Sequence, residues 1–205
     1  MKILVTAFDP FGGESVNPAE LAVGMLPERI GDAEICRVTV PTVYALAAER
    51  AIAAYEALRP DAVVCIGQAG GRAAVTPERV AINAADARIP DNHGNQPVDQ
   101  PIAADGPAAY FSTLPIRAME EAIRALDLPA AISNTAGTFV CNDLMYRMLH
   151  HVAGSGRGVP CGFIHVPFIP EQTADKPDKP SMPLEDILRA LTAALEVLVH
   201  GLQNS

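Results

Sequence analysis

The stretch Ala62-Val-Val-Cys-Ile-Gly67 is a continuous apolar run that ends in glycine. A short run without polar side chains is typical of a strand buried on both faces, as in a parallel sheet. An alanine-rich helix pattern over residues 43–58 precedes it and stops before Pro60. The segment therefore predicts an α/β fold in which residues 62–67 form an inner strand of the sheet.

The alternation of strand and helix patterns continues along the chain. Further strands are predicted over residues 2–6, 34–40, 78–84, 130–133 and 162–166. Further helices are predicted from Asn17 onwards and over residues 115–126, 142–152 and 184–202, with loops over 9–16, 87–112 and 170–183. Without a repeat or a domain-sized change in composition, residues 1–205 are expected to form one domain, a three-layer α/β/α sandwich with a mixed, mostly parallel twisted sheet.

Composition and charge exclude several classes of function. The chain has 205 residues, 49% of them hydrophobic, which is enough for a packed core. A net charge of −9 without a basic stripe argues against a nucleic-acid partner. The apolar run at the N-terminus is too short for a signal peptide, and no segment approaches the ~18 apolar residues of a membrane span. A cytoplasmic protein that does not bind membranes is expected.

The four cysteines (Cys36, Cys65, Cys141 and Cys161) are therefore expected to be reduced. They contain no Cys-x-x-Cys pair, so we expect no structural zinc, and the sequence suggests no other metal or cofactor. Three of them lie in apolar, strand-like surroundings and are interpreted as core residues. Cys141 differs because it lies where a small-residue turn leads into a helix pattern.

Cys141 and His165 form a candidate nucleophile and base. A helix N-terminus favours thiolate over thiol, and His165 follows within a second strand pattern. Such a pair can lower the thiol pKa to ~3–4, which predicts a preformed thiolate–imidazolium ion pair. A third group usually orients the imidazole, and Glu78, at the start of a strand pattern, is one acidic candidate among several.

Several ordered blocks of the sequence resemble pyroglutamyl peptidase I, a family of intracellular cysteine exopeptidases. The resemblance runs in register to about Gln172 and leaves only the C-terminal helix without distinctive motifs. The blocks are Thr6-Ala-Phe-Asp-Pro-Phe-Gly-Gly-Glu14 with Asn17-Pro18, Gly67-Gln-Ala-Gly-Gly-Arg72, Glu78-Arg-Val-Ala-Ile-Asn83, Asp86-Ala-Arg-Ile-Pro-Asp-Asn92, Asn95-Gln-Pro97, Ser133-Asn-Thr-Ala-Gly-Thr-Phe-Val-Cys-Asn142 and Gly162-Phe-Ile-His-Val-Pro-Phe-Ile-Pro-Glu-Gln172.

The resemblance implies that the chain hydrolyses the amide bond after an N-terminal pyroglutamyl residue. It implies a triad of Glu78, Cys141 and His165, with Arg88 beside the nucleophile supporting the reacting carbonyl. It also implies a homotetramer. The residues that it places around the pyroglutamyl ring are Phe8, Phe11, Asn17, Gln68, Ile89, Phe139 and Val140, with Asn17 offering backbone groups to the lactam.

Other interpretations of these residues remain open in the sequence. Glu78 can pair with Arg79, and Arg88 with Asp86 or Asp91. Asp143 departs from the familiar pattern and is expected to cap the helix outwards. For the whole chain the alternatives are a nucleoside-phosphorylase-like enzyme, although Gly67–Arg72 lacks the residues of a phosphate loop, and a non-catalytic thiol redox or binding module.

Overall fold

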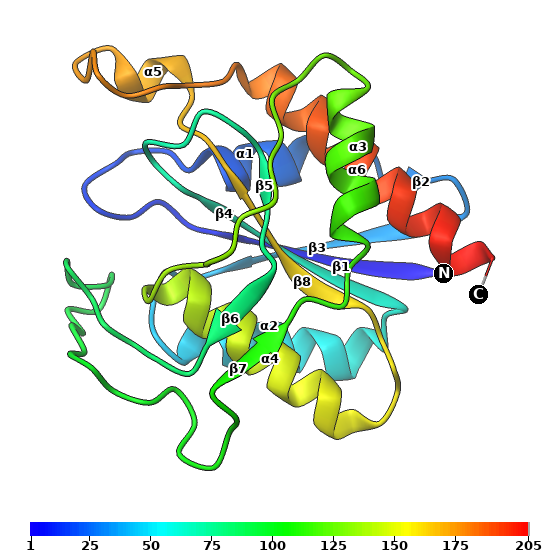
Figure 1. Ribbon diagram of the computed structural model, residues 1–205, viewed down its shortest axis with the longest axis horizontal. Coiled ribbons are helices and arrows are strands. Elements are labelled where there is room, and N and C mark those ends of the chain that lie inside the picture. The colour runs from blue at the N-terminus through cyan, green and yellow to red at the C-terminus, as the bar shows by residue number, and fades with distance from the viewer. Residues whose placement is uncertain (205) are drawn as a thin grey trace.

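The computed structural model describes residues 1–204 and consists of a central sheet between two layers of helices. The six strands of the main sheet lie in the order β2-β3-β1-β4-β8-β5 (Figure 1). Their bounds are β2 Arg29–Ile30, β3 Ala33–Val40, β1 Lys2–Phe8, β4 Ala62–Gln68, β8 Cys161–Val166 and β5 Thr76–Pro77. The β3-β1-β4-β8 pairings are parallel, whereas β2 and β5 pair antiparallel at the two edges, so the sheet is mixed and mostly parallel as predicted.

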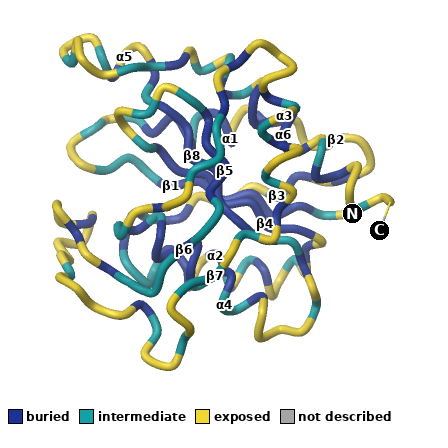
Figure 2. Tube along the Cα trace, in the orientation of Figure 1, coloured by how far each residue is buried: buried dark blue, intermediate teal, exposed yellow. Residues whose placement is uncertain are grey.

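Helices cover both faces of this sheet because its inner strands are apolar on both faces. Along β4, Val64 and Ile66 belong to one core cluster, and Val63 and Cys65 belong to the other. The first cluster packs under α1 (Pro18–Met25), α3 (Ile116–Arg124) and α6 (Leu184–Gln203). The second packs under α2 (Leu46–Leu58) and α4 (Val140–Ser155), and Figure 2 shows the buried strands between the two layers.

The predicted strand over residues 78–84 is shorter in the structure and lies outside the main sheet. The chain leaves the main sheet after β5, passes Glu78, and forms the separate two-stranded pair of β6 (Val80–Ile82) and β7 (Ala109–Phe111). The prediction of a strand over 130–133 is wrong. That segment makes only two isolated bridges, Val75 to Ala130 and Glu78 to Ser133, because the β5 segment beside it is itself too short to support a ladder.

Smaller differences concern helix ends. The helix predicted from residue 142 begins two residues earlier, at Val140, so Cys141 lies in its first turn. The helix predicted from residue 43 begins at Leu46, because Ala45 takes a positive φ of 59° and ends a tight turn. A four-residue helix, α5 (Pro170–Thr173), lies in the predicted loop 170–183. Among the described residues, no helix combines the length and apolar character needed to cross a membrane.

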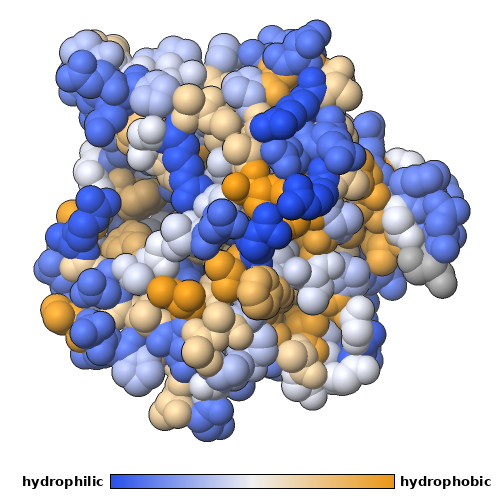
Figure 3. Space-filling model, in the orientation of Figure 1, coloured by the Kyte–Doolittle hydropathy of each residue, from blue (hydrophilic) through white to orange (hydrophobic). Residues whose placement is uncertain are grey.

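The parallel strands bring three segments to one edge of the sheet. β1, β4 and β8 all end there, at Phe8, Gln68 and Val166. The loops that follow them therefore meet on this side, which is where open α/β sheets bind ligands. Figure 3 shows the surface hollowed on the same side, with weakly apolar side chains at its base.

Candidate active site

Cys141 is presented by the first turn of α4. The turn before it is held by Ser133 and Thr135, whose side chains bond to nearby backbone groups, and by Gly137 with a φ of 82°. Phe139 is the N-cap residue and offers no side-chain cap, so the first amides of α4 are not satisfied by a capping side chain. The Cys141 thiol is thus placed where unpaired backbone amides point.

The thiol lies directly over strand β4 because Gly67 has no side chain. A Cβ atom on Gly67 would come within 3.1 Å of the Cys141 Sγ and 2.7 Å of the Phe163 ring. Gly67 is paired in register with His165 on the adjacent strand β8. Register partners in a sheet project to the same face, so the thiol and the imidazole lie over neighbouring strands on one face.

His165 is oriented by Glu78. The imidazole Nδ1 lies 2.6 Å from the Glu78 Oε1, and both side chains are buried, at 4% and 0% exposure. Burial raises the pKa of Glu78, but the hydrogen bond and charge of His165 outweigh it, with help from Ser133 and Arg72, and leave that pKa below its ordinary value. Because the carboxylate is ionised and accepts only, Nδ1 carries the proton and Nε2 keeps a free lone pair.

Burial works against the preformed ion pair that the sequence predicts. Burial raises the pKa of the Cys141 thiol to about 12, and the charge of Glu78 raises it further, against smaller lowering effects of Arg72 and of the residue's own amide. Burial also lowers the pKa of His165 more than Glu78 raises it. Desolvation thus disfavours the charged form of each partner, the thiolate and the imidazolium.

Arg72 is a functional candidate that the sequence reasoning missed. Its guanidinium donates to the Glu78 Oε1 at 2.5 Å, to the Thr76 hydroxyl at 2.6 Å and to the Thr135 carbonyl at 3.2 Å. It therefore connects the orienting carboxylate to the turn that carries Cys141. Glu78 pairs with this arginine and not with Arg79, which donates to Asn134 instead. The sequence feature that could have identified Arg72 is its position in the glycine-rich loop directly after β4.

The expected aromatic wall is assembled from three loops. The Phe11 and Phe139 rings lie 6.1 Å apart, and Tyr44 meets Phe139 edge-on at 5.6 Å. Tyr44, which the sequence reasoning also missed, donates its hydroxyl to the Thr138 carbonyl at 3.0 Å. Phe8 is fully buried against Phe163 and closes the base of this region. Val140 is likewise buried.

Asn17 and Gln68 lie buried at the ends of their elements. The Asn17 side chain caps α1 through the Ala19 amide and donates to the Asp9 carbonyl, which fixes the loop after β1. Its backbone carbonyl accepts from Leu21, which leaves the second lone pair of that oxygen for another donor. Gln68 ends β4, and its Oε1 accepts from Gln172 at 2.9 Å.

Arg88 and Ile89 are exposed on the loop after β6. Among the described residues, Arg88 forms no ion pair, so neither Asp86 nor Asp91 is its partner. The loop itself is fastened to the nucleophile's turn, since Asp86 and Thr138 exchange two hydrogen bonds of 3.0 and 2.7 Å. Ile89 is 44% exposed and its Cδ1 faces Gly12.

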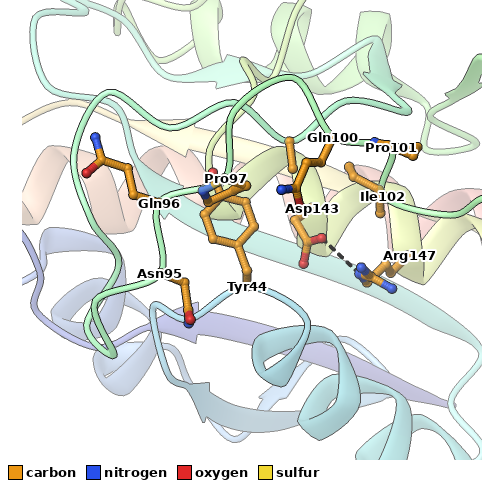
Figure 4. A pocket seen from close by; sticks show the side chains of 10 residues that line it. Tyr44, Asn95, Gln96, Pro97, Gln100, Pro101, Ile102, Asp143 and Arg147 are labelled. Atoms are coloured by element: carbon orange, nitrogen blue, oxygen red, sulfur yellow. Dashed lines mark hydrogen bonds and ion pairs between the residues drawn. The ribbon is translucent and has the colours of Figure 1, made fainter.

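Asp143 does not cap α4 outwards as expected. It is 1% exposed, accepts from the Ala45 amide at 2.9 Å and pairs with Arg147 at 2.8 Å. The Asp143–Arg147 pair lines a cavity of about 360 Å³ that Tyr44 and the loop of residues 95–102 enclose on the other sides (Figure 4). This cavity opens on a different side of α4 from Cys141, because residues two apart on a helix point in nearly opposite directions.

The chain is similar in sequence and in structure to known peptidases. The family Peptidase_C15, described as pyroglutamyl peptidase, matches residues 1–201. A pyrrolidone-carboxylate peptidase of Streptococcus pyogenes is 58% identical over 199 residues, which cover 97% of this chain and 93% of that protein. The crystal structure of Bacillus amyloliquefaciens pyroglutamyl peptidase I superposes with a TM-score of 0.94 at 48% identity, covering 97% of both chains. Pyrrolidone carboxyl peptidase of Pyrococcus furiosus gives 0.94 at 45% identity, covering 98% of this chain and 100% of that one.

Proposed function

The chain belongs to the pyroglutamyl peptidase family, and we propose that Cys141, His165 and Glu78 carry out its reaction. The reaction is hydrolysis of the amide bond after an N-terminal pyroglutamyl residue by a cysteine exopeptidase. The observation that supports the assignment most is the buried Glu78–His165 hydrogen bond of 2.6 Å, with the Cys141 thiol over the adjacent strand. Neither a nucleoside-phosphorylase-like enzyme nor a redox module is favoured by the family match.

The first half-reaction begins with a neutral pair. His165 takes the thiol proton on Nε2 as the Cys141 sulfur attacks the carbonyl carbon of the scissile amide. Glu78 stabilises the imidazolium that forms. The Cys141 amide, in the uncapped first turn of α4, donates to the tetrahedral oxyanion. The imidazolium then protonates the departing amine, which leaves a thioester on Cys141. We retain Arg88 as support for the reacting carbonyl, reaching from the loop that is tied to Thr138.

The second half-reaction uses the same groups in reverse roles. His165 removes a proton from a water molecule that attacks the thioester carbonyl, and it returns that proton to the sulfur as pyroglutamate leaves. In both half-reactions the imidazolium and the oxyanion exist only while a tetrahedral intermediate is present, and the thioester state between them is neutral. A pair that rests neutral therefore needs the substrate to bring it into the charged state.

The substrate ring is small, flat and uncharged, which suits walls of Phe11, Phe139 and the other predicted pocket residues. The lactam N–H and C=O need hydrogen-bond partners once they are buried. Proline has neither group, so a pocket that supplies partners for both discriminates against it. An unblocked N-terminal ammonium is disfavoured because its desolvation is not offset by a carboxylate in that wall.

The remaining expectations stand as proposals. Residues 1–205 act as one catalytic domain, the partners are N-terminally pyroglutamylated peptides, and the protein works in the cytoplasm as a homotetramer. Sedimentation velocity of the purified chain tests the tetramer, and a monomer at micromolar concentration contradicts it.

The assignment of residues is tested by turnover of pyroglutamyl p-nitroanilide under reducing conditions. We expect Cys141→Ala to abolish turnover and His165→Ala to lower kcat by about 10³-fold, since a positioned general base contributes on this scale. Cys36→Ala is the matched control, because Cys36 is also a free and partly exposed thiol. Retained activity in Cys141→Ala contradicts the mechanism, and an inactive wild-type enzyme contradicts the reaction itself.

A further inference from the structure

Gln172, on the short helix α5, has no place in the mechanism above, yet its side chain is 4% exposed and forms four hydrogen bonds. α5 is fastened over the loop that follows β1. Lys176 pairs with Glu14 at 2.9 Å and donates to the Gln172 carbonyl at 2.8 Å. A buried amide beside the substrate loops therefore needs an explanation.

Two backbone groups fix which way the Gln172 amide faces. Its Oε1 accepts from the Ile169 N–H at 3.3 Å, and an N–H can only donate. Its Nε2 donates to the Val16 carbonyl at 3.4 Å, and a carbonyl can only accept. The Glu14 carboxylate lies at 3.4 Å from the same nitrogen. All three contacts agree, so the amide has only one satisfactory orientation.

That orientation is passed on to Gln68. The Gln172 Nε2 also donates to the Gln68 Oε1 at 2.9 Å, so Gln68 directs its oxygen towards α5. The Gln68 Nε2 then faces away from α5, and no other described residue hydrogen-bonds to the Gln68 side chain. Gln68 is 7% exposed at the end of β4, next to Gly67 and the nucleophile.

We infer that Gln172 is a specificity-determining positioning residue that makes Gln68 a hydrogen-bond donor towards the substrate. The group that a fixed NH₂ takes is the ring carbonyl of the pyroglutamyl residue, so the lactam N–H finds its acceptor elsewhere. The inference rests on the proposed function, because it takes Gln68 to line the ring pocket. Gln172 itself touches no substrate atom.

The isosteric variant Gln172→Glu reverses this arrangement. The new carboxylate still accepts from Ile169, but its second oxygen faces the Gln68 Oε1, which turns Gln68 to donate towards α5 and to present its oxygen to the pocket. When the substrate binds, the Gln68 oxygen and the ring carbonyl oxygen then face each other, and both are acceptors. We expect KM for pyroglutamyl aminomethylcoumarin to rise about tenfold or more, with kcat changed by less than about threefold.

Further variants separate positioning from folding. Gln203→Glu makes the same change of charge at an exposed site on α6 and is expected to leave KM unaltered. Gln172→Met removes the donor without adding charge and is expected to raise KM by about threefold, because Gln68 is no longer fixed in one orientation. Alkylation of Cys141 by iodoacetamide is expected to keep its rate and pH dependence in both Gln172 variants.

Ring fragments identify which substrate group Gln68 meets. 2-Pyrrolidinone and cyclopentanone both keep the ring carbonyl, and only the former has the N–H. We expect both to inhibit Gln172→Glu more weakly than wild type, by similar factors. The inference is overturned if the Gln172→Glu change weakens inhibition by 2-pyrrolidinone but not by cyclopentanone. It is also overturned if KM is unchanged in both Gln172 variants, or if kcat falls without a rise in KM. A wild-type enzyme that does not cleave the substrate contradicts the proposed function instead.

Discussion

Two buried carboxylates, Glu78 and Asp143, lie near Cys141 and differ in one of their partners. Glu78 is 0% exposed and pairs with Arg72, and Asp143 is 1% exposed and pairs with Arg147. In both cases a guanidinium compensates a carboxylate that has lost water. On charge and burial alone, the two regions look equivalent.

The third partner makes the difference between them. Glu78 shares its oxygen with the Nδ1 of His165, a group that changes charge during proton transfer. Asp143 accepts from the Ala45 amide, which stays neutral, and so fixes the start of α2 against α4. In the proposed mechanism Glu78 therefore takes part in catalysis through His165, whereas Asp143 holds α2 and α4 together.

Isosteric amide variants test this comparison most directly. We expect Glu78→Gln to lower kcat/KM by about 10²-fold, because the amide stabilises an imidazolium poorly and permits the wrong tautomer. This loss is smaller than that of Cys141→Ala or His165→Ala. Asp143→Asn is expected to stay within about threefold of wild type, since it contacts no member of the triad. Steady-state kinetics on pyroglutamyl p-nitroanilide measure both, and equal losses contradict the comparison.

The pH profile of Glu78→Gln tests the same comparison through the direction in which the acid limb of kcat/KM moves. Glu78 raises the pKa of His165, and burial lowers it below 6.5 overall. Activity of the wild type should therefore fall only as the pH drops below 6.5, where the imidazole becomes protonated and can no longer accept the thiol proton. Removing the carboxylate charge lowers that pKa further, so the acid limb of kcat/KM moves to lower pH.

Arginine variants extend the comparison with a smaller effect. We expect Arg72→Met to lower kcat/KM by about tenfold, because Glu78 and the Thr135 carbonyl lose their common donor. Arg72 lowers the pKa of His165, so its removal moves the acid limb to higher pH, opposite to Glu78→Gln. Arg147→Met, in the other region, is the matched control and should leave the limb in place. A shift to lower pH in Arg72→Met shows that the guanidinium acts on something other than the imidazole.

Local sequence patterns predicted the fold, but they could not predict contacts between residues far apart in the chain. The apolar run 62–67 and the alternating elements were enough for the layered sheet, since periodicity records burial directly. The role of Arg72 was not predicted because its partners, Glu78 and Thr135, come into contact with it only when the chain folds. The same holds for the burial of Asp143. The helix end that favours a thiolate at Cys141 is visible in the sequence, whereas the burial that raises the pKa of this thiol is not.

Asp143 should matter for stability where Glu78 matters for rate. The Ala45 amide lies in a turn with a φ of 59°, a conformation that costs a residue other than glycine about 1 kcal/mol or more and that the hydrogen bond to Asp143 holds in place. We expect Asp143→Asn to lower the free energy of unfolding by about 1 kcal/mol and Asp143→Ala by about 2 kcal/mol, because only the latter leaves the amide unpaired. Urea unfolding measures both.

Two measurements together decide the role of Asp143. We expect the free energy of unfolding to fall while the acid limb of the kcat/KM profile stays at the same pH. A variant that loosens the contact of α2 with α4 reduces the folded fraction but leaves every folded molecule with its own imidazole, carboxylate and thiol. The profile of kcat/KM against pH then keeps its shape while the urea midpoint falls. If Asp143→Asn displaces the limb instead, Asp143 influences His165 through α4, and the two buried carboxylates belong to one electrostatic unit.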